Sequence, residues 1–354
     1  MSYNQEWSTQ YYPSKLYSKE NLYSNMSIEK TVLGKDLEIC RILNGMWQVA
    51  GGHGQIDSES AIADMEKYQN SGFTTWDLAD IYGPAESLIG EFRRKIDTEG
   101  KFQALTKFVP NPGPMSSSIV THYIEQSLQK MDTNCIDLLQ FHWWDYSDAS
   151  YLDALSNLSK LQRENKIKHL GLTNFDTERV KIMKEHGYNI VSNQVQYSIL
   201  DQRPDKLMAS FFAKHGIKIL SYGTLLGGFF SEKYLGVDEP HRGDLTTSSL
   251  QKYKNMIDAW GGWQLFQELL STLNDIAQKH HCSIANVATR FVLDKPQVAG
   301  VIIGARLGIA EHRENNTQVF NVKLDSQDIS SIDAVTVKAN DLFDVIGDCG
   351  GEYR

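Results

Sequence analysis

The sequence has no apolar run near the roughly 20 residues that a membrane-spanning helix needs. Its first 25 residues, MSYNQEWSTQYYPSKLYSKENLYSN, are polar and rich in tyrosine, without the apolar centre of a secretory signal peptide. These two absences predict a soluble protein of the cytoplasm that has no membrane partner.

Cysteine and positive charge are also scarce. Four cysteines are scattered along the chain, without a CxxC pair or a zinc-ligand spacing, so reduced thiols and no metal site are expected: Cys40, Cys135, Cys282 and Cys349. The 35 basic residues are outnumbered by 44 acidic residues, which gives a net charge of −9. Because this balance provides no basic surface for a phosphate backbone, a nucleic-acid partner is not expected.

The 354 residues do contain a regular alternation of short apolar runs and amphipathic stretches. A hairpin is expected around Gly34 and Lys35 in TVLGKDLEICRI. Eight strand-like runs follow, at 41–47, 73–77, 102–107, 136–142, 169–174, 190–194, 217–222 and 298–303. Helix-like segments lie between them, at 58–71, 117–131, 152–165, 177–186 and 206–215. This alternation predicts βαβ units with parallel strands.

Eight such strands predict an α/β protein with a closed (β/α)8 TIM barrel, an N-terminal β-hairpin and additional C-terminal helices. The additional helices are expected at 263–280 and 283–293, after a glycine-containing insertion at 222–250. A doubly wound open sheet is the alternative, although GGHGQID lacks the third glycine of a GxGxxG motif. The predicted organisation is a polar extension (1–28), a single barrel domain (29–340) and a tail (341–354). Whether the extension and tail contact a neighbouring subunit or cover the barrel mouth stays open.

Polar residues stand at or near the carboxyl ends of six predicted strands: Asp77, Lys107, His142, Asn174, Gln194 and Tyr222. A buried polar group is costly unless it is paired, so six such strand ends exceed what a core needs. In a barrel, the carboxyl ends of the strands carry the chemistry. We therefore expect the six side chains to converge on one site.

Four residues in this region form a candidate acid–base site. Tyr82 follows Asp77 by five residues in WDLADIYGPAE, so a short loop can place its phenol over the barrel mouth. An ammonium group about 4 Å away, at a dielectric constant of about 20, favours a phenolate by roughly 4 kcal/mol. We expect Lys107 to lower the Tyr82 pKa toward neutrality while Asp77 holds Lys107. Neutral His142 is expected to orient a substrate carbonyl.

Several motifs resemble the aldo-keto reductase family over about residues 31–337: GFTTWDLADIYGPAE, LTKF, DLLQFHWWDY, HLGLTNF, SNQVQYS, LSYGTLLGG and VIIGARLGIAEHRENN. The resemblance implies a TIM barrel that binds a nicotinamide cofactor without a Rossmann fold. It also implies that Tyr82 is the acid/base, that Lys107 and Asp77 tune it, and that His142 orients the substrate.

The resemblance extends to the part of the site that would hold the nicotinamide and the pyrophosphate. It implies that Thr173, Asn174 and Gln194 bind the carboxamide. It also implies that the nicotinamide ring stacks on Tyr222, and that a loop covers the pyrophosphate with Leu225 and Gly227. Gly223 and Thr224 depart from the Ser and Pro or Ala that the family often has there.

The remaining cofactor positions lie near the C-terminus. Gly304, Ala305 and Arg306 precede an expected short helix, and backbone donors with a guanidinium suit a phosphate. The resemblance implies that Glu314 and Asn315 contact the adenine. Many members that prefer NADP have a Lys-Ser pair and an arginine, where this chain has Ala305-Arg306 and Glu311. Arg306 favours NADPH as the cofactor, and NADH stays open.

The stretch FHWWDY places two tryptophans directly after His142. Trp143 and Trp144 are expected to line a substrate pocket, with Trp47 of GMWQ facing them. Aromatic walls suit flat or apolar carbonyl compounds. Packing between the barrel and its helices is the alternative for at least one tryptophan.

The sequence therefore predicts an NAD(P)H-dependent carbonyl reductase that interconverts aldehydes or ketones with alcohols. The alternative is a redox-sensing, cofactor-binding subunit with little turnover, similar to the cytoplasmic partners of potassium channels. A hydrolase on the same fold would need two carboxylates in the pocket, and only Asp77 is clearly placed. The natural carbonyl compound, the direction of the reaction and the oligomeric state, a homo-oligomer included, stay open.

Overall fold

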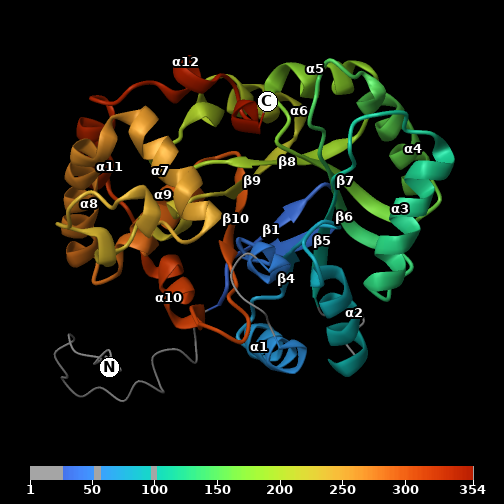
Figure 1. Cartoon of the computed structure of the whole chain (residues 1–354), viewed down its shortest axis with the longest axis horizontal. Coiled ribbons are helices and arrows are strands. Elements are labelled where there is room, and N and C mark those ends of the chain that lie inside the picture. The colour runs from blue at the N-terminus through green and yellow to red at the C-terminus, as the bar shows by residue number, and fades with distance from the viewer. Residues whose placement is uncertain (1–26, 52–56, 97–101, 354) are drawn as a thin grey trace.

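A computed structural model describes residues 27–51, 57–96 and 102–353, so most of the predicted extension lies outside the described residues. In this part of the chain, eight parallel strands close a barrel in the order β10-β3-β4-β5-β6-β7-β8-β9 (Figure 1). The strands are β3 (Ile42–Gly45), β4 (Thr75–Asp77), β5 (Gln103–Phe108), β6 (Ile136–Phe141), β7 (Ile167–Thr173), β8 (Ile190–Gln196), β9 (Lys218–Tyr222) and β10 (Val298–Gly304). The TIM-barrel prediction is confirmed, with each strand in or beside its predicted run.

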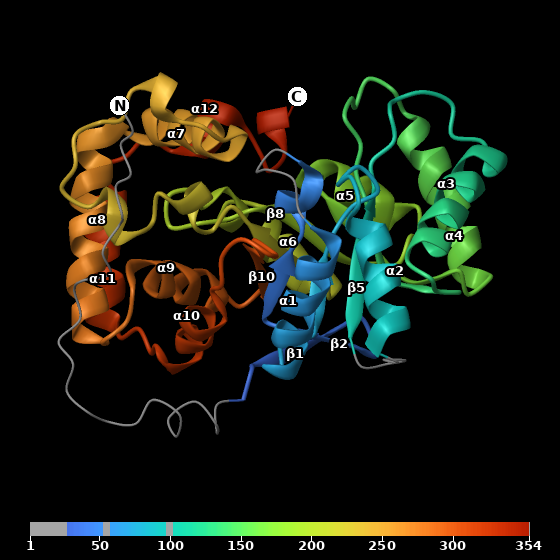
Figure 2. The same cartoon turned by 60° about the horizontal axis from the view of Figure 1, so that its bottom comes forward.

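The predicted hairpin is also present and closes one end of the barrel. Strands β1 (Lys30–Leu33) and β2 (Leu37–Cys40) pair antiparallel, and their apolar side chains join a cluster with Leu105, Leu138 and Leu220. These three leucines lie two residues before Lys107, Gln140 and Tyr222 on the same strands. The hairpin therefore seals the end of the barrel opposite the polar strand ends, and Figure 2 shows it opposite the C-terminal segment.

Helices surround the barrel and extend it on one side (Figures 1 and 2). They are α1 (Ser58–Asn70), α2 (Ala85–Ile96), α3 (Ser117–Lys130), α4 (Ser150–Arg163), α5 (Thr177–Glu185), α6 (Met208–His215), α7 (Ser248–Trp260), α8 (Gly262–Lys279), α9 (Ile284–Leu293), α10 (Arg313–Gln318), α11 (Ser326–Thr336) and α12 (Leu342–Ile346). The expected helices near the C-terminus correspond to α8 and α9. Among the described residues, no helix combines the length and apolar character that crossing a membrane requires.

Helices α2, α7, α11 and α12 have no predicted counterpart. Helices α2 and α7 each bury a charged residue on the face that packs inward, Glu86 in α2 and Lys254 in α7. Partners on other elements satisfy these charges: Thr106 donates to Glu86 at 2.8 Å, and Lys254 pairs with Glu239 at 2.6 Å. Apolar residues nonetheless recur at helical spacing along the buried face of both helices, at positions 85, 88, 89 and 92 and at positions 253, 256, 257 and 260. The sequence therefore contains the signal for both helices, and the prediction missed it.

The turn at the mouth after β9 depends on glycine. Gly223 has φ +73°, and a Cβ at this position would lie 2.4 Å from the hydroxyl of Tyr253 on α7. Gly227 has φ +66°, and its Cβ would meet the Tyr253 ring at 3.1 Å. Glycine therefore allows the loop after β9 to turn beneath α7, which brings α7 close to the mouth.

Candidate active site

A buried ion pair lies at the centre of the polar strand ends. Lys107 on β5 donates to Asp77 Oδ2 on β4 at 2.6 Å and to the backbone oxygen of Leu78 at 2.9 Å. Asp77 Oδ1 accepts from the side-chain amides of Gln140 at 2.9 Å and Gln194 at 2.7 Å. These bonds satisfy a carboxylate and an ammonium that are both nearly inaccessible to water. The structure therefore brings Asp77, Lys107 and Gln194 together, as expected from their positions at strand ends.

Tyr82 lies beside this pair, on the loop that follows β4. The Lys107 ammonium is 5.0 Å from the centre of the Tyr82 ring, and the ring of Trp47 packs edge-on at 5.0 Å from the same centre. Burial raises the pKa of the Tyr82 phenol well above its usual value, and the charge of Asp77 raises it further. The expected lowering of this pKa is therefore wrong for this structure. Asp77 balances the charge of Lys107, so that charge does not fully offset the loss of water around the phenol.

His142 follows β6 and faces the mouth, with its ring held from one side. Its Nδ1 lies 3.1 Å from the backbone oxygen of Thr173. Because a carbonyl oxygen only accepts, Nδ1 carries a proton. In neutral His142 the other nitrogen, Nε2, is then an acceptor, and only the imidazolium has a second N–H for a substrate carbonyl. The expectation that neutral His142 donates to the carbonyl is therefore corrected.

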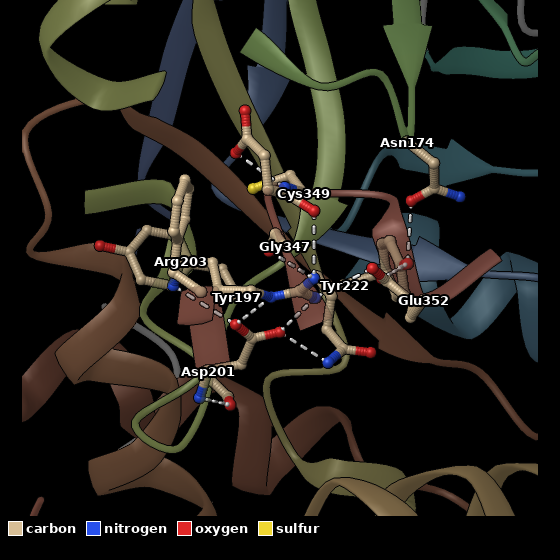
Figure 3. A network of polar contacts seen from close by, with 12 residues as sticks. Asn174, Tyr197, Asp201, Arg203, Tyr222, Gly347, Cys349 and Glu352 are labelled. Carbon is tan, nitrogen blue, oxygen red and sulfur yellow. Dashed lines mark hydrogen bonds and ion pairs between the residues drawn. The ribbon is translucent and has the colours of Figure 1, made fainter. Parts of the chain in front are cut away.

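Asn174 and Tyr222 meet at the mouth, one at the end of β7 and the other at the end of β9 (Figure 3). The Tyr222 hydroxyl lies 2.9 Å from Asn174 Oδ1. Asn174 has φ +58°, a left-handed conformation that asparagine tolerates better than most residues, and this turns the chain sharply after β7. Thr173 is buried, and its hydroxyl donates to the Gln194 backbone oxygen at 3.2 Å. Of the three residues expected at the carboxamide, Asn174 is therefore at the mouth, whereas the side chains of Thr173 and Gln194 bond within the barrel.

The three tryptophans occupy different positions. Trp47 is 45% exposed beside Tyr82, and the Trp144 ring lies 4.3 Å from the His142 ring, so both border the mouth. Trp143 is fully buried in the core between barrel and helices, where its indole N–H donates to the backbone oxygens of Asp145 and Asp148. Successive residues along a strand point to opposite faces, so Trp143 points away from the side that holds His142. Trp143 is therefore a core residue, and its expected place in the pocket is wrong.

The predicted phosphate and adenine positions lie on β10 and beyond it. Gly304 ends β10, and a Cβ there would lie 2.6 Å from the Gln48 amide nitrogen. Helix α10 begins only at Arg313, so a turn separates Arg306 from the helix, contrary to the expected direct succession. Glu314 is exposed, and Asn315 bonds to Asn286 and Ser283 at the start of α9. Asn315 thus already fixes α10 to α9.

Other residues at the mouth were not predicted. Gln140 was absent from the expected site, although alternation along IDLLQFH places it on the face of Leu138 and His142. Glu352 and Tyr353 reach the mouth from the tail, and both contact the Tyr222 hydroxyl at 3.2 Å. No local pattern marks these two residues, because their contacts join positions 130 and 131 residues apart.

Comparison with known proteins decides the family. Residues 41–337 match the Aldo/keto reductase family. The chain belongs to this family. L-glyceraldehyde 3-phosphate reductase of Escherichia coli is 24% identical over 82% of this chain and 86% of its own length. Norsolorinic acid reductase B of Dothistroma septosporum is 25% identical over 80% of this chain and 73% of its own length.

A non-enzymatic name also occurs among the relatives. Flagellar radial spoke protein 5 of Chlamydomonas reinhardtii is 28% identical over 61% of this chain, which spans only 49% of that protein. Among solved structures, a glycerol dehydrogenase of Gluconobacter oxydans superimposes with a TM-score of 0.73 at 21% identity, over 90% of this chain and 96% of its own. A thermostable aldo-keto reductase in complex with the inhibitor epalrestat superimposes with a TM-score of 0.68 at 22% identity, over 87% of this chain and 100% of its own. The structural likeness shows the fold, and the family with its relatives indicates an NAD(P)-dependent oxidoreductase.

Proposed function

We propose that this aldo/keto reductase family member reduces the carbonyl group of a small aldehyde or ketone, in a reversible reaction that uses NADPH. The observation that carries the proposal is the buried Lys107–Asp77 pair directly beside Tyr82, with His142 at the same mouth. A phenol beside a fixed ammonium can give a proton to an oxygen and remain stabilised as phenolate. The proposal includes action as a cytoplasmic enzyme on a small molecule.

The catalytic roles follow from the contacts. Tyr82 gives its proton to the carbonyl oxygen, and the high pKa produced by burial keeps the phenol protonated before reaction. Lys107 stabilises the phenolate that remains, while Asp77 fixes the position of the ammonium. His142 as imidazolium donates to the carbonyl oxygen, and as neutral imidazole it accepts from the alcohol in the reverse reaction.

The residues at the mouth fit a nicotinamide. Tyr222 presents a ring beside the Asn174 amide, which is the combination that a flat ring bearing a carboxamide requires. A bound nicotinamide would supply the hydride that the carbonyl carbon accepts. The loop with Leu225 and Gly227 would cover the pyrophosphate. Arg306 would hold the 2′-phosphate of NADPH, because a guanidinium donates paired, charge-assisted hydrogen bonds to a phosphate.

A second function is a redox-sensing subunit that binds cofactor with little turnover. The relationship to a flagellar radial spoke protein favours this candidate, as do the tail contacts with Tyr222. Both functions use the same cofactor residues, so cofactor binding alone does not separate them.

Oxidation of NADPH, followed at 340 nm with a panel of aromatic and aliphatic aldehydes and ketones, tests the proposal. Parallel reactions with NADH measure the cofactor preference. Turnover that favours NADPH supports the reductase. Tight cofactor binding without turnover on any compound supports the redox-sensing subunit, and no binding of either nucleotide contradicts both functions.

A further inference from the structure

The segment Gly347–Tyr353, called the tail segment here, returns to the barrel mouth after α12. Figure 2 shows the C-terminal end on the side opposite the hairpin, and Figure 3 shows Glu352 close to Tyr222. The segment ends in a short 3₁₀ turn at Gly351–Tyr353. Its last side chains therefore lie where the proposed reaction takes place.

A buried arginine anchors the tail segment. The Arg203 guanidinium is 1% exposed and donates to both Asp201 oxygens at 2.8 Å. The same group pairs with Glu352 at 3.0 Å and donates to the backbone oxygens of Gly347 and Asp348 at 3.5 and 3.3 Å (Figure 3). Arg203 therefore joins the start and the end of the tail segment. We expect the whole segment to move together if it leaves the barrel mouth.

The tip of the segment holds the residues proposed to receive the nicotinamide. Glu352 and Tyr353 both contact the Tyr222 hydroxyl at 3.2 Å, and Lys252 on α7 donates to the Tyr353 hydroxyl at 2.5 Å. The centre of the Tyr353 ring lies 6.3 Å from that of His142 and 6.4 Å from that of Trp144. Tyr353 therefore spans the space between the proposed stacking ring and the proposed substrate-orienting residue.

This position conflicts with the geometry of the reaction. A carbonyl held by Tyr82 and His142 has to meet a ring stacked on Tyr222, and Tyr353 lies between these groups. The closed arrangement thus places Tyr353 where the reacting atoms would meet.

We propose that the tail segment is an autoinhibitory latch, clasped by Arg203, that closes the mouth and is displaced when a dinucleotide binds. The proposal rests on the proposed function, because the groups that the latch covers are those assigned to the nicotinamide and the carbonyl. Apparent affinity falls in proportion to the fraction of open protein, so the latch reduces dinucleotide affinity until it opens.

Cys349 gives a direct measure of opening. Its side chain is 1% exposed beside Arg203, and burial raises its pKa well above the usual value, so a maleimide reacts slowly while the latch is closed. The experiment uses the full chain with Cys135→Ser and Cys282→Ser, which removes the two half-buried thiols. Cys40, which is buried at the end of strand β2, is the internal control. Peptide mass spectrometry measures labelling at both cysteines with and without saturating NADPH.

The latch predicts that NADPH increases the labelling rate of Cys349 at least about fivefold and leaves Cys40 unchanged. Binding of NADPH with unchanged or slower labelling of Cys349 overturns the latch and leaves the proposed function intact. In that outcome the tail segment is a fixed wall of the site. If NADPH does not bind at all, the proposed function fails and the latch fails with it.

A variant of the tip tests the same idea without relying on turnover. Tyr353→Ala is expected to label faster at Cys349 without NADPH and to bind NADPH about tenfold more tightly, measured by fluorescence titration. Val345→Ala on α12, which changes an exposed side chain, is the matched control and should behave like the parent. Weaker NADPH binding by Tyr353→Ala, with labelling like the parent, overturns the latch.

Discussion

At the scale of single residues, the proposed chemistry depends on Tyr82. Replacement of Tyr82 by phenylalanine removes the proposed proton donor but keeps the ring beside Trp47 and Lys107. We expect kcat/KM for aldehyde reduction to fall by about 10²–10⁴, since this is the usual contribution of a general acid. NADPH binding should stay within about twofold, because Tyr82 is not assigned to the cofactor.

The matched control is Tyr123→Phe, which changes an exposed tyrosine on α3. It should retain the kcat/KM of the unmodified chain. If the kcat/KM of Tyr82→Phe is comparable with that of the control, Tyr82 is not the proton donor.

Arg306 gives a second prediction at this scale. Arg306→Ala should raise the KM for NADPH about tenfold, the value of one charge-assisted contact, and change the KM for NADH little. Arg94→Ala, on the exposed side of α2, is the control, and steady-state kinetics with both cofactors measures the difference. An equal change for NADPH and NADH would show that Arg306 does not recognise the 2′-phosphate.

The sequence predicted that several residues of the candidate site lie together, and parts of their expected chemistry were wrong. The carboxyl ends of parallel strands meet at one end of a barrel, which brings Asp77 and Lys107 together. The loop after β4 then places Tyr82 beside them. The pKa of Tyr82 was misjudged because it depends on how much water reaches the phenol, which no pattern of residues records. Trp143 was misplaced for a related reason, since the turn after β6 decides which of two adjacent tryptophans faces inward.

At the scale of elements, the contact between α2 and α3 depends on a glycine. A Cβ at Gly90 would lie 2.1 Å from the backbone oxygen of Lys130. This clash involves the backbone, so a change of side-chain rotamer cannot relieve it. Gly90→Ala should therefore push the two helices apart and reduce the free energy of unfolding by about 1–3 kcal/mol, measured by urea denaturation.

Gly243→Ala is the control, because a Cβ at Gly243 meets nothing within 4 Å. The control should unfold at the urea concentration of the unmodified chain. An unchanged midpoint for Gly90→Ala would mean that α2 and α3 do not pack as closely as described.

The eight strands and many of the helices were predictable because each has a periodic apolar pattern and a length typical of βαβ units. Helices α2 and α7 were equally predictable, because apolar residues recur at helical spacing along both buried faces. The sequence could not show how the buried charges of Glu86 and Lys254 are satisfied, because their partners come from other elements.

At the scale of the whole molecule, stability should depend on pH through Asp80. Burial raises the pKa of this carboxyl from 3.8 to about 6. The folded state therefore favours the protonated form, and stability is lost as pH rises from about 4 through 6. Asp80→Asn removes this loss, so the variant should gain up to roughly 2 kcal/mol relative to the unmodified chain between pH 4 and pH 7.

Urea denaturation at several pH values measures this difference. Comparing the two chains at each pH cancels the other titrating groups. Curves that run parallel from pH 4 to pH 7 would contradict the raised pKa of Asp80.

The path of the whole chain also sets the limit of prediction. The tail segment contacts Tyr222 and Arg203 across more than a hundred residues, and its contacts are made by ordinary charged and polar groups. Nothing in GDCGGEY alone indicates an anchor in the barrel, so the position of the tail had to come from the structure.

Transfer of deuterium to an aromatic aldehyde from NADPH labelled at either of the two C4 positions tests the proposed hydride transfer directly. We expect an alcohol that carries deuterium on the former carbonyl carbon from only one of the two labelled cofactors, because one face of the nicotinamide would stack on Tyr222. An alcohol without deuterium, or labelled equally from both cofactors, would contradict direct hydride transfer in an ordered site.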